Sequence, residues 1–293
     1  DRSETLGLVG ESGCGKSVTS LSIMRLIAKP QGRIVNGSIF FGDRDLCTIP
    51  ERDMRKIKRN GISIIYQELM TSLNPVFSVG NQIIEAIGIH KSIKKKDAFV
   101  LATETLNMVG IPNPQRRLKE YPHQMSGGMR QRMMIAMALV CKPELLIADE
   151  PTTALDVTIQ AQILKLMDDL KDEIGASILL ITHDLAVIAE MAQRVAVMYA
   201  GKIVESADVI EFFNHPLHPY TVGLMDSIPR MDGPIPEDRL LQTIPGVVPS
   251  LLELPDGCAF YGRCLSRSSE CLEMSPRLKE VSPGHWVRCM KYA

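Results

Sequence analysis

A glycine-rich loop, Gly-x-x-x-x-Gly-Lys-Ser, occupies residues 10–17 and limits the folds open to this chain. It lies between an apolar run, Leu6–Val9, that favours a strand, and a segment, Ser17–Ala28, that favours a helix. This order lets backbone N–H groups and the helix N-terminus converge on one phosphate group. Lys16 can reach the β- and γ-phosphates of a nucleotide, and Ser17 offers a hydroxyl to Mg²⁺. The candidate phosphate-binding residues are Gly10, Glu11, Ser12, Gly13, Cys14, Gly15, Lys16 and Ser17.

Length and composition indicate a globular protein, disfavour nucleic-acid binding without excluding it, and give no sign of a membrane span. The 293 residues are 45% hydrophobic and can form one large domain plus a smaller one, or two domains. The 33 lysines and arginines nearly balance the 34 aspartates and glutamates, which leaves no broad basic face for nucleic acid or anionic lipid. No apolar run approaches the roughly 18 residues that span a bilayer, and the N-terminus lacks signal-peptide features. We therefore expect a soluble, cytoplasmic chain.

Apolar runs separated by turn residues predict an α/β fold with a mainly parallel sheet, as in phosphate-loop NTPases. Strands are expected at residues 37–41, 62–66, 145–148 and 176–182, and as a hairpin at 194–200 and 202–206. No strand is evident from 79 to 140, so we expect a helical insert at about 76–140. Because a phosphate-loop strand normally lies inside its sheet, we expect N-terminal strands to be missing before Asp1. A rise in proline and cysteine content places a domain boundary near Ser206, between domains at 1–206 and 207–293.

Polar side chains follow several of the predicted strands. Asp149 and Glu150 come directly after the apolar run 145–148, and Gln67 and His183 follow two other strands. Because the carboxyl ends of parallel strands form the ligand edge of such sheets, these side chains should share one site with the glycine loop. A carboxylate at Asp149 can hold Mg²⁺ through water while Lys16 neutralises the phosphates. The sequence therefore predicts an ATPase site.

These residues resemble, in order, the six motifs of the ATP-binding subunits of ABC transporters. Gly10–Ser17 resembles the Walker A loop, Gln67 the Q-loop glutamine, and Leu145–Glu150 the Walker B strand. The signature, D-loop and switch motifs are matched by Ser126-Gly127-Gly128, Ala154-Leu155-Asp156 and His183. The resemblance implies that Glu150 polarises the attacking water, that His183 contacts the γ-phosphate, and that Mg²⁺ is held by Ser17, Gln67 and Asp149.

The resemblance also implies a dimer, because the signature would bind the ATP of a partner subunit. Ser126, Gly127 and Gly128 offer a hydroxyl, amides and a helix N-terminus, but this chain's phosphates are already held by its own loop. Asp156 would lie in the same partner-facing region. Met125 and Met129 stand where the commonest signature has Leu and Gln, which leaves hydrogen bonding from the last position in doubt.

Two C-terminal stretches narrow the resemblance to oligopeptide and dipeptide importers. They are residues 215–221, His-Pro-Leu-His-Pro-Tyr-Thr, and residues 244–251, Ile-Pro-Gly-Val-Val-Pro-Ser-Leu. The implied function is ATP-driven import of peptides, or of a related small solute such as nickel. The implied partners are a second ATPase subunit (a paralogue or a second copy), two permease subunits and, indirectly, a solute-binding protein. The expected location is the cytoplasmic face of the cell membrane, as a peripheral subunit, with no nucleic acid bound.

Four of the seven cysteines lie close together near the C-terminus: Cys258, Cys264, Cys271 and Cys289. This segment has few large apolar residues, so a metal would help to hold it together. Structural zinc favours short C-x₂₋₄-C pairs, which are absent here, whereas Cys₄ ligation also suits a [4Fe–4S] cluster. The peptide-importer subunits that the chain resembles carry cysteines in the same C-terminal place, and this resemblance favours the [4Fe–4S] cluster, with Zn²⁺ as the alternative and a disulfide framework disfavoured. Its expected role is structural, and a redox gate on ATPase output is the alternative role.

Two other functions remain open at the level of sequence. One is a soluble ABC-type ATPase, which usually carries two cassettes or a long coiled-coil insert. The other is a redox- or metal-sensing module on an ATPase scaffold, against which Lys16, Asp149 and Glu150 argue. Stimulation of ATP turnover by peptide or permease would distinguish them.

Overall fold

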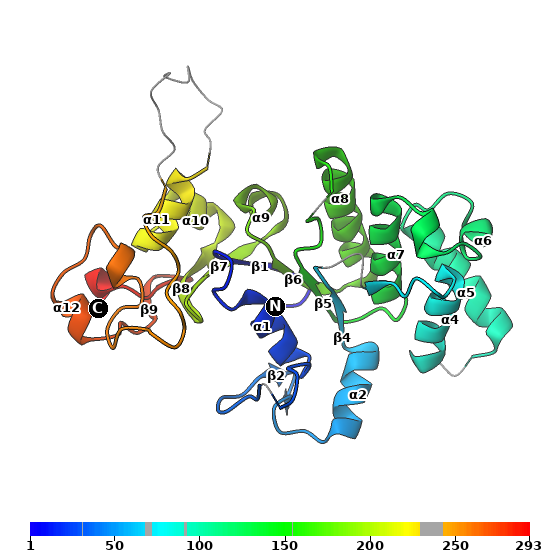
Figure 1. The fold of residues 1–293 in the computed structure, drawn as a ribbon, viewed down its shortest axis with the longest axis horizontal. Coiled ribbons are helices and arrows are strands. Elements are labelled where there is room, and N and C mark those ends of the chain that lie inside the picture. The colour runs from blue at the N-terminus through cyan, green and yellow to red at the C-terminus, as the bar shows by residue number, and fades with distance from the viewer. Residues whose placement is uncertain (31, 68–71, 91–92, 154, 229–242) are drawn as a thin grey trace, which may run out of the picture. The chain divides into compact units, whose positions relative to one another are not determined.

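The computed structural model describes all residues except 31, 68–71, 91–92, 154 and 229–242 (Figure 1). The described residues form two compact units. The first comprises Asp1–Thr5 and Ser17–Ile181, and the second comprises Leu6–Lys16 and Thr182–Ala293. The glycine loop up to Lys16 therefore belongs to the second unit, and Ser17 belongs to the first.

Three parallel strands form the sheet of the first unit, in the order β4–β5–β6. They are β4 (Ile62–Ile65), β5 (Leu145–Asp149) and β6 (Ser177–Ile181). Leu145 pairs with Ile62 on one side and with Ser177 on the other, and Asp149 pairs with Ile181. β5 is almost entirely buried, as its continuous apolar sequence predicts for a parallel strand covered on both faces. The strand therefore delivers Asp149 at a defined edge of the sheet.

Helices make up most of the rest of the first unit. They are α1 (Lys16–Ile23), α2 (Glu51–Asn60), α4 (Val79–His90), α5 (Lys95–Met108), α6 (Pro114–Arg117), α7 (Gly127–Leu139), α8 (Val157–Ile174) and the 3₁₀ turn η1 (Pro122–Gln124). A small hairpin pairs β2 (Phe40–Phe41) with β3 (Arg44–Asp45). Helices α4, α5, α6 and α7 pack together (Figure 1), and the described residues between β4 and β5 contain no strand.

The two helices that flank β5 in the chain begin at side-chain caps. The Ser126 hydroxyl accepts a hydrogen bond from the Met129 N–H at 3.3 Å, at the start of α7. The Asp156 carboxylate accepts one from the Ile159 N–H at 3.0 Å, at the start of α8. Each cap satisfies a backbone donor that the first helical turn leaves unpaired. Gly175 ends α8 with φ 67°, a left-handed conformation that glycine adopts without strain.

The second unit has a mixed sheet in the order β1–β7–β8–β10–β9. β1 (Thr5–Val9) runs parallel to β7 (Arg194–Tyr199), and the other neighbours are antiparallel. Those other strands are β8 (Lys202–Asp208), β9 (Lys279–Ser282) and β10 (His285–Val287). The hairpin expected around Gly201 is confirmed as β7–β8, whereas β9 and β10 were not foreseen.

Short helices and an aromatic core complete the second unit. The helices are α9 (Leu185–Met191), α10 (Val209–Asn214), α11 (Pro219–Asp226) and α12 (Glu270–Glu273), with 3₁₀ turns η2 (Tyr261–Arg263) and η3 (Met290–Tyr292). Tyr199, Tyr220 and Phe260 are buried, and their ring centroids lie 4.7–5.4 Å apart. These rings bring β7, α11 and the C-terminal segment into one core, since aromatic pairs at such distances are stabilising.

Some elements differ from the sequence expectation. The helix after the glycine loop ends at Ile23 rather than Ala28, because Arg25 has φ 48°, which breaks the helical turn. The strand expected at 37–41 is reduced to Phe40–Phe41. The boundary expected near Ser206 falls inside β8, where Ser206 pairs with Trp286 of β10. The chain passes from one compact unit to the other after Thr5, after Lys16 and after Ile181.

Candidate functional site

The glycine loop is shaped by backbone that only glycine tolerates. Gly10, Gly13 and Gly15 have φ of 154°, 82° and 111°. A Cβ on Gly10 would collide with the Met198 carbonyl oxygen and would lie 2.8 Å from the Cys14 sulfur. The Gly201 N–H donates to the Cys14 carbonyl at 2.8 Å, which fixes the loop to the β7–β8 turn. The loop thus has the tight conformation that phosphate binding requires.

Lys16 is folded over this loop and is buried, with 6% of its surface exposed. Its ammonium donates to the carbonyl oxygens of Gly10 at 2.6 Å and Glu11 at 3.2 Å. Cys14 is also buried, and burial raises the pKa of its thiol although the Lys16 charge lies near. A cation held among backbone groups at the carboxyl end of β1 suits a polyphosphate.

A hydroxyl–carboxylate cluster lies in the first unit, as predicted for a magnesium site. The Ser17 hydroxyl donates to Asp149 Oδ1 and the Ser20 hydroxyl to Asp149 Oδ2, each at 3.2 Å. Asp149 is 5% exposed at the end of β5. Hydroxyl and carboxylate oxygens are the ligands that Mg²⁺ takes beside nucleotide phosphates. The structure brings together Ser17 and Asp149, which the sequence analysis assigned to Mg²⁺, and adds Ser20, which lies one helical turn after Ser17 and was not foreseen.

Glu150 has strained backbone and two side-chain partners. Its φ of 49° is left-handed, which is unusual for a glutamate, and its N–H donates to the Ile181 carbonyl at 2.8 Å. Its Oε2 accepts from Gln67 Nε2 at 2.7 Å and from the Thr153 hydroxyl at 3.0 Å. The structure therefore brings together Gln67 and Glu150, as the strand-end argument predicted. Thr153 was not foreseen.

The signature residues lie at the start of α7, where the Ser126 side chain serves as the helix cap. Gly128 packs against α8, since a Cβ there would lie 2.8 Å from Ile159 Cγ2. Around Gly127 there is more room, with Leu155 Cδ2 at 3.7 Å from a Cβ. Asp156 caps α8, and Ala154 of the expected D-loop lies outside the described residues. The close packing of α7 on α8 is therefore sufficient to explain a glycine at position 128, whether or not a ligand binds there.

The predicted site residues are divided between the two units. Residues 10–16 and His183 belong to the second unit, and His183 is exposed just before α9. The first unit contains Ser17, Gln67, Asp149, Glu150, the signature and Asp156. Within each unit the structure forms the local clusters described above.

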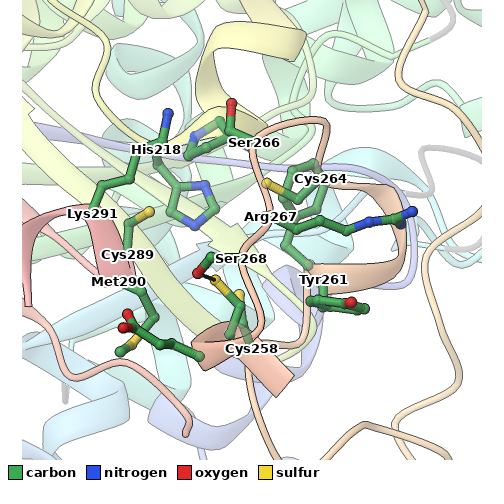
Figure 2. A pocket seen from close by; sticks show the side chains of 14 residues that line it. His218, Cys258, Tyr261, Cys264, Ser266, Arg267, Ser268, Cys289, Met290 and Lys291 are labelled. Atoms are coloured by element: carbon green, nitrogen blue, oxygen red, sulfur yellow. Dashed lines mark hydrogen bonds between the residues drawn. The ribbon is translucent and has the colours of Figure 1, made fainter. Parts of the chain in front are cut away.

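All four C-terminal cysteines line one cavity of about 160 Å³ in the second unit (Figure 2). Burial raises the pKa of the thiols of Cys258, Cys264 and Cys289, and neighbouring cysteines add to each shift. His218 also lines the cavity, and burial lowers its pKa to about 4. Its ring Nδ1 accepts the Tyr220 N–H at 3.0 Å, which requires the neutral ring. Four thiols in one cavity have the donor chemistry that an iron–sulfur cluster or zinc needs.

The same cysteines do not form a ready-made coordination sphere. Within the part of the chain that the structure describes, no group of three or more His, Cys, Asp or Glu side chains is arranged to hold a metal ion. The Cys271 sulfur lies 3.4 Å from the Ser268 hydroxyl. A bound metal would therefore require these side chains to turn toward a common centre.

The glycine loop with its buried lysine, and the hydroxyl–carboxylate pair after β5, define a phosphate-loop ATPase. Comparison with known proteins specifies which one. The family described as ABC transporter matches residues 1–153, and the family described as oligopeptide/dipeptide transporter, C-terminal region, matches residues 204–271. The chain belongs to the ABC transporter family, among the ATP-binding subunits of its oligopeptide/dipeptide group.

Curated relatives align with nearly the whole chain. The probable peptide ABC transporter ATP-binding protein y4tR of Sinorhizobium fredii is 55% identical over 98% of this chain and 85% of its own length. The oligopeptide transport ATP-binding protein AppD of Bacillus subtilis is 54% identical over 99% of this chain and 88% of its own length. The oligopeptide transport ATP-binding protein OppD of Escherichia coli is 48% identical over 98% of this chain and 84% of its own length.

Solved structures show the same fold. A dimeric, post-hydrolysis structure of the ATP-binding cassette MJ0796 with ADP and phosphate has a TM-score of 0.63 and 25% identity, covering 71% of this chain and 87% of that one. The structure of cbiO1 from Clostridium perfringens, part of the transporter complex cbiONQ, has a TM-score of 0.63 and 26% identity, covering 73% and 81%. Among the described residues no helix is long and apolar enough to cross a bilayer.

Proposed function

We propose that the chain is the ATP-hydrolysing subunit that powers import of dipeptides and oligopeptides, or of a related small solute, through an ABC transporter. The observation that carries this proposal is the match of one chain to both the ABC transporter family and the oligopeptide/dipeptide C-terminal region. The relatives named above support it, because they are described as peptide or oligopeptide transport ATP-binding proteins and align with almost every residue.

In this proposal each cluster of the site has a role in ATP hydrolysis. Residues 10–16 hold the ATP phosphates, and Lys16 neutralises the β- and γ-phosphates. Ser17 and Asp149 would hold Mg²⁺, with Gln67 as a further ligand, and the ion would neutralise the negative charge that develops on the phosphates. Glu150 accepts the proton of the attacking water, and Gln67 and Thr153, which hydrogen-bond to its carboxylate, orient it. His183 contacts the γ-phosphate.

Two copies, or one copy and a paralogue, complete the ATP sites. Ser126, Gly127 and Gly128 form an anion site at the start of α7 for the partner's ATP, and Asp156 lies at that interface. The dimeric MJ0796 structure named above supports such pairing. ATP binding closes the dimer and hydrolysis reopens it, as in other nucleotide-driven closures.

The remaining segments connect the ATPase to its partners. The helical segment at about 76–140 transmits closure to two permease subunits, and a solute-binding protein delivers the solute to them. This places the chain at the cytoplasmic face of the membrane as a peripheral subunit. The C-terminal part from residue 207 carries the four-cysteine cavity, whose cysteines would ligate a [4Fe–4S] cluster, or Zn²⁺ as the alternative. The proposed role of that metal is structural.

The test of this function is Glu150→Gln in the assembled transporter. We expect ATP to bind with unchanged affinity and peptide-stimulated hydrolysis to fall by about 10²–10⁴, because a positioned general base contributes that much. Glu173→Gln, an exposed carboxylate on α8, is the matched control. Lys16→Ala should instead weaken ATP binding, because it removes a charge-assisted contact.

Two outcomes would contradict the proposal. Near-normal hydrolysis by Glu150→Gln would remove its catalytic role. Hydrolysis by the wild type that responds to neither permease nor peptide would favour a soluble ABC ATPase or a sensor module.

A further inference from the structure

The Glu11 side chain, in the glycine loop, forms an ion pair with Arg263, which lies 252 positions later in the chain. The two side chains form a parallel, bidentate pair: Arg263 Nη1 donates to Glu11 Oε2 at 2.6 Å, and Nη2 donates to Oε1 at 2.9 Å. The Arg263 side chain is 7% exposed and that of Glu11 is 32% exposed. Such forked, charge-assisted pairs fix both distance and orientation.

Arg263 is itself rigidly placed. It is the last residue of η2 and directly precedes Cys264, which lines the cysteine cavity. Its Nε donates to the Pro245 carbonyl at 2.8 Å, and its guanidinium lies 5.8 Å from the centroid of the Tyr199 ring. The guanidinium therefore approaches Glu11 from a fixed direction.

Three parts of Glu11 form hydrogen bonds: its carboxylate, its N–H and its carbonyl. Arg263 holds its carboxylate, the Tyr220 hydroxyl accepts its N–H at 2.8 Å, and its carbonyl accepts the Lys16 ammonium at 3.2 Å. A change in the position of Glu11 would therefore move the backbone that holds Lys16. An unpaired Glu11 carboxylate would also add negative charge beside the place of the phosphates.

We propose that Arg263 is a positioning residue of the ATP site, which holds Glu11 so that the glycine loop keeps its shape and its positive charge. This inference rests on the proposed role of residues 10–16 in binding ATP. It makes a residue of the C-terminal part necessary for tight ATP binding although it touches neither the phosphates nor the water. A residue that merely held the two segments together would affect stability and leave the KM for ATP unchanged.

The experiment measures ATP hydrolysis by the assembled transporter as a function of ATP concentration. The variants are Arg263→Gln, Glu11→Gln, the double variant and Arg263→Lys, with Arg277→Gln as an exposed control in the same segment. Arg263→Gln should raise the KM for ATP about tenfold and change kcat less than about twofold, since a lost charged hydrogen bond of ordinary strength corresponds to such a factor. Arg263→Lys keeps the charge without the fork and should recover part of the loss.

The double variant provides the decisive comparison. If the two residues act as a pair, the KM for ATP of the double variant should be no higher than that of Arg263→Gln alone. It should be lower, because the double variant no longer has the unpaired Glu11 charge beside the phosphates. Thermal midpoints of all variants identify any that fail to fold. Arg277→Gln should match the wild type.

Three results would overturn the inference: an unchanged KM in a folded Arg263→Gln variant, effects of the single substitutions that multiply in the double variant, or an equal rise in the Arg277→Gln control. Failure of the proposed function is distinguishable, because then the wild type itself would show no peptide-stimulated hydrolysis.

Discussion

Among single residues, Glu205 is a fully buried acidic side chain in the described part of the second unit. It lies on β8 with none of its surface exposed. Its carboxylate accepts the N–H groups of Leu217 and His218, each at 2.8 Å, and His285 Nε2 lies 2.8 Å from Oε1. One side chain thereby connects β8, the start of α11 and β10. A buried carboxylate is stable only when its oxygens are paired in this way.

We therefore predict that Glu205→Gln lowers the free energy of unfolding by about 3 kcal/mol, although the side chains have the same size. The amide offers one acceptor oxygen in place of two, so its NH₂ group would face a buried N–H donor. Chemical unfolding of the purified protein measures the change. Glu273→Gln, at an exposed position on α12, is the control and should stay within about 0.5 kcal/mol of the wild type. Equal stability of Glu205→Gln and the wild type would contradict this account.

Some site residues can be predicted from sequence because their positions depend on local rules. Lys16 and Ser17 follow a strand–glycine loop–helix pattern, and Asp149 follows an apolar strand, so their neighbourhood is determined within a few residues. Arg263 could not be found in this way. Its pairing with Glu11 arises only when the C-terminal segment packs beside the glycine loop, and a single arginine near cysteines gives no signal of that contact.

At the scale of secondary-structure elements, the start of α7 combines a helix cap with close packing on α8. Gly127 and Gly128 are adjacent, but only Gly128 meets a neighbour closely, through Ile159. Packing on α8 therefore accounts for Gly128, whereas Gly127 has no packing requirement of this kind. Substituting each glycine in turn can distinguish packing from the proposed binding of a partner's ATP.

We predict that Gly128→Ala destabilises the protein by about 1–3 kcal/mol, because the added methyl group overpacks the contact between α7 and α8. Gly127→Ala should leave stability unchanged or slightly raised, since alanine favours a helix and finds room. Thermal unfolding of the two variants side by side measures the difference. A larger loss for Gly127→Ala than for Gly128→Ala would show that the packing account is wrong.

The elements themselves were predictable to different degrees. The long apolar strands were found, because their sequence patterns are local. β9 and β10 were not, since they are short and carry few apolar residues, and they form because β10 pairs with β8. Length of the first helix was overestimated, because the left-handed turn at Arg25 has no sequence signal comparable to a glycine.

At the scale of the whole molecule, the C-terminal part is not a separate appendage to the glycine loop. Both belong to the second unit, where β10 extends the sheet that contains β1. The segment that contains Cys258, Phe260, Arg263 and Cys264 contributes to the aromatic core, to the pair with Glu11 and to the cysteine cavity. Whatever holds the cavity together should therefore also influence the phosphate loop.

This connection leads to our last prediction, which concerns Cys258, Cys264, Cys271 and Cys289. Anaerobic purification should yield a brown protein with about four iron and four labile sulfide per chain, the content of a Cys₄-ligated cubane. Replacing any one of the four cysteines with serine should remove the cluster, because the variant lacks one of the four thiolate ligands. Iron and sulfide analysis with the visible spectrum measures this, and Cys47→Ser in the first unit is the control.

The same variants test the link to the ATP site. Loss of the cluster in Cys264→Ser should raise the KM for ATP in the direction expected for Arg263→Gln, since η2 and the position of Arg263 depend on the folded cavity. One zinc per chain without colour would reject the iron–sulfur cluster and keep the four-ligand site, and absence of any metal would reject both. A normal KM in a cluster-free Cys264→Ser variant would show that Arg263 is positioned by the aromatic core alone, because Phe260 and Tyr199 would then suffice to hold η2 in place.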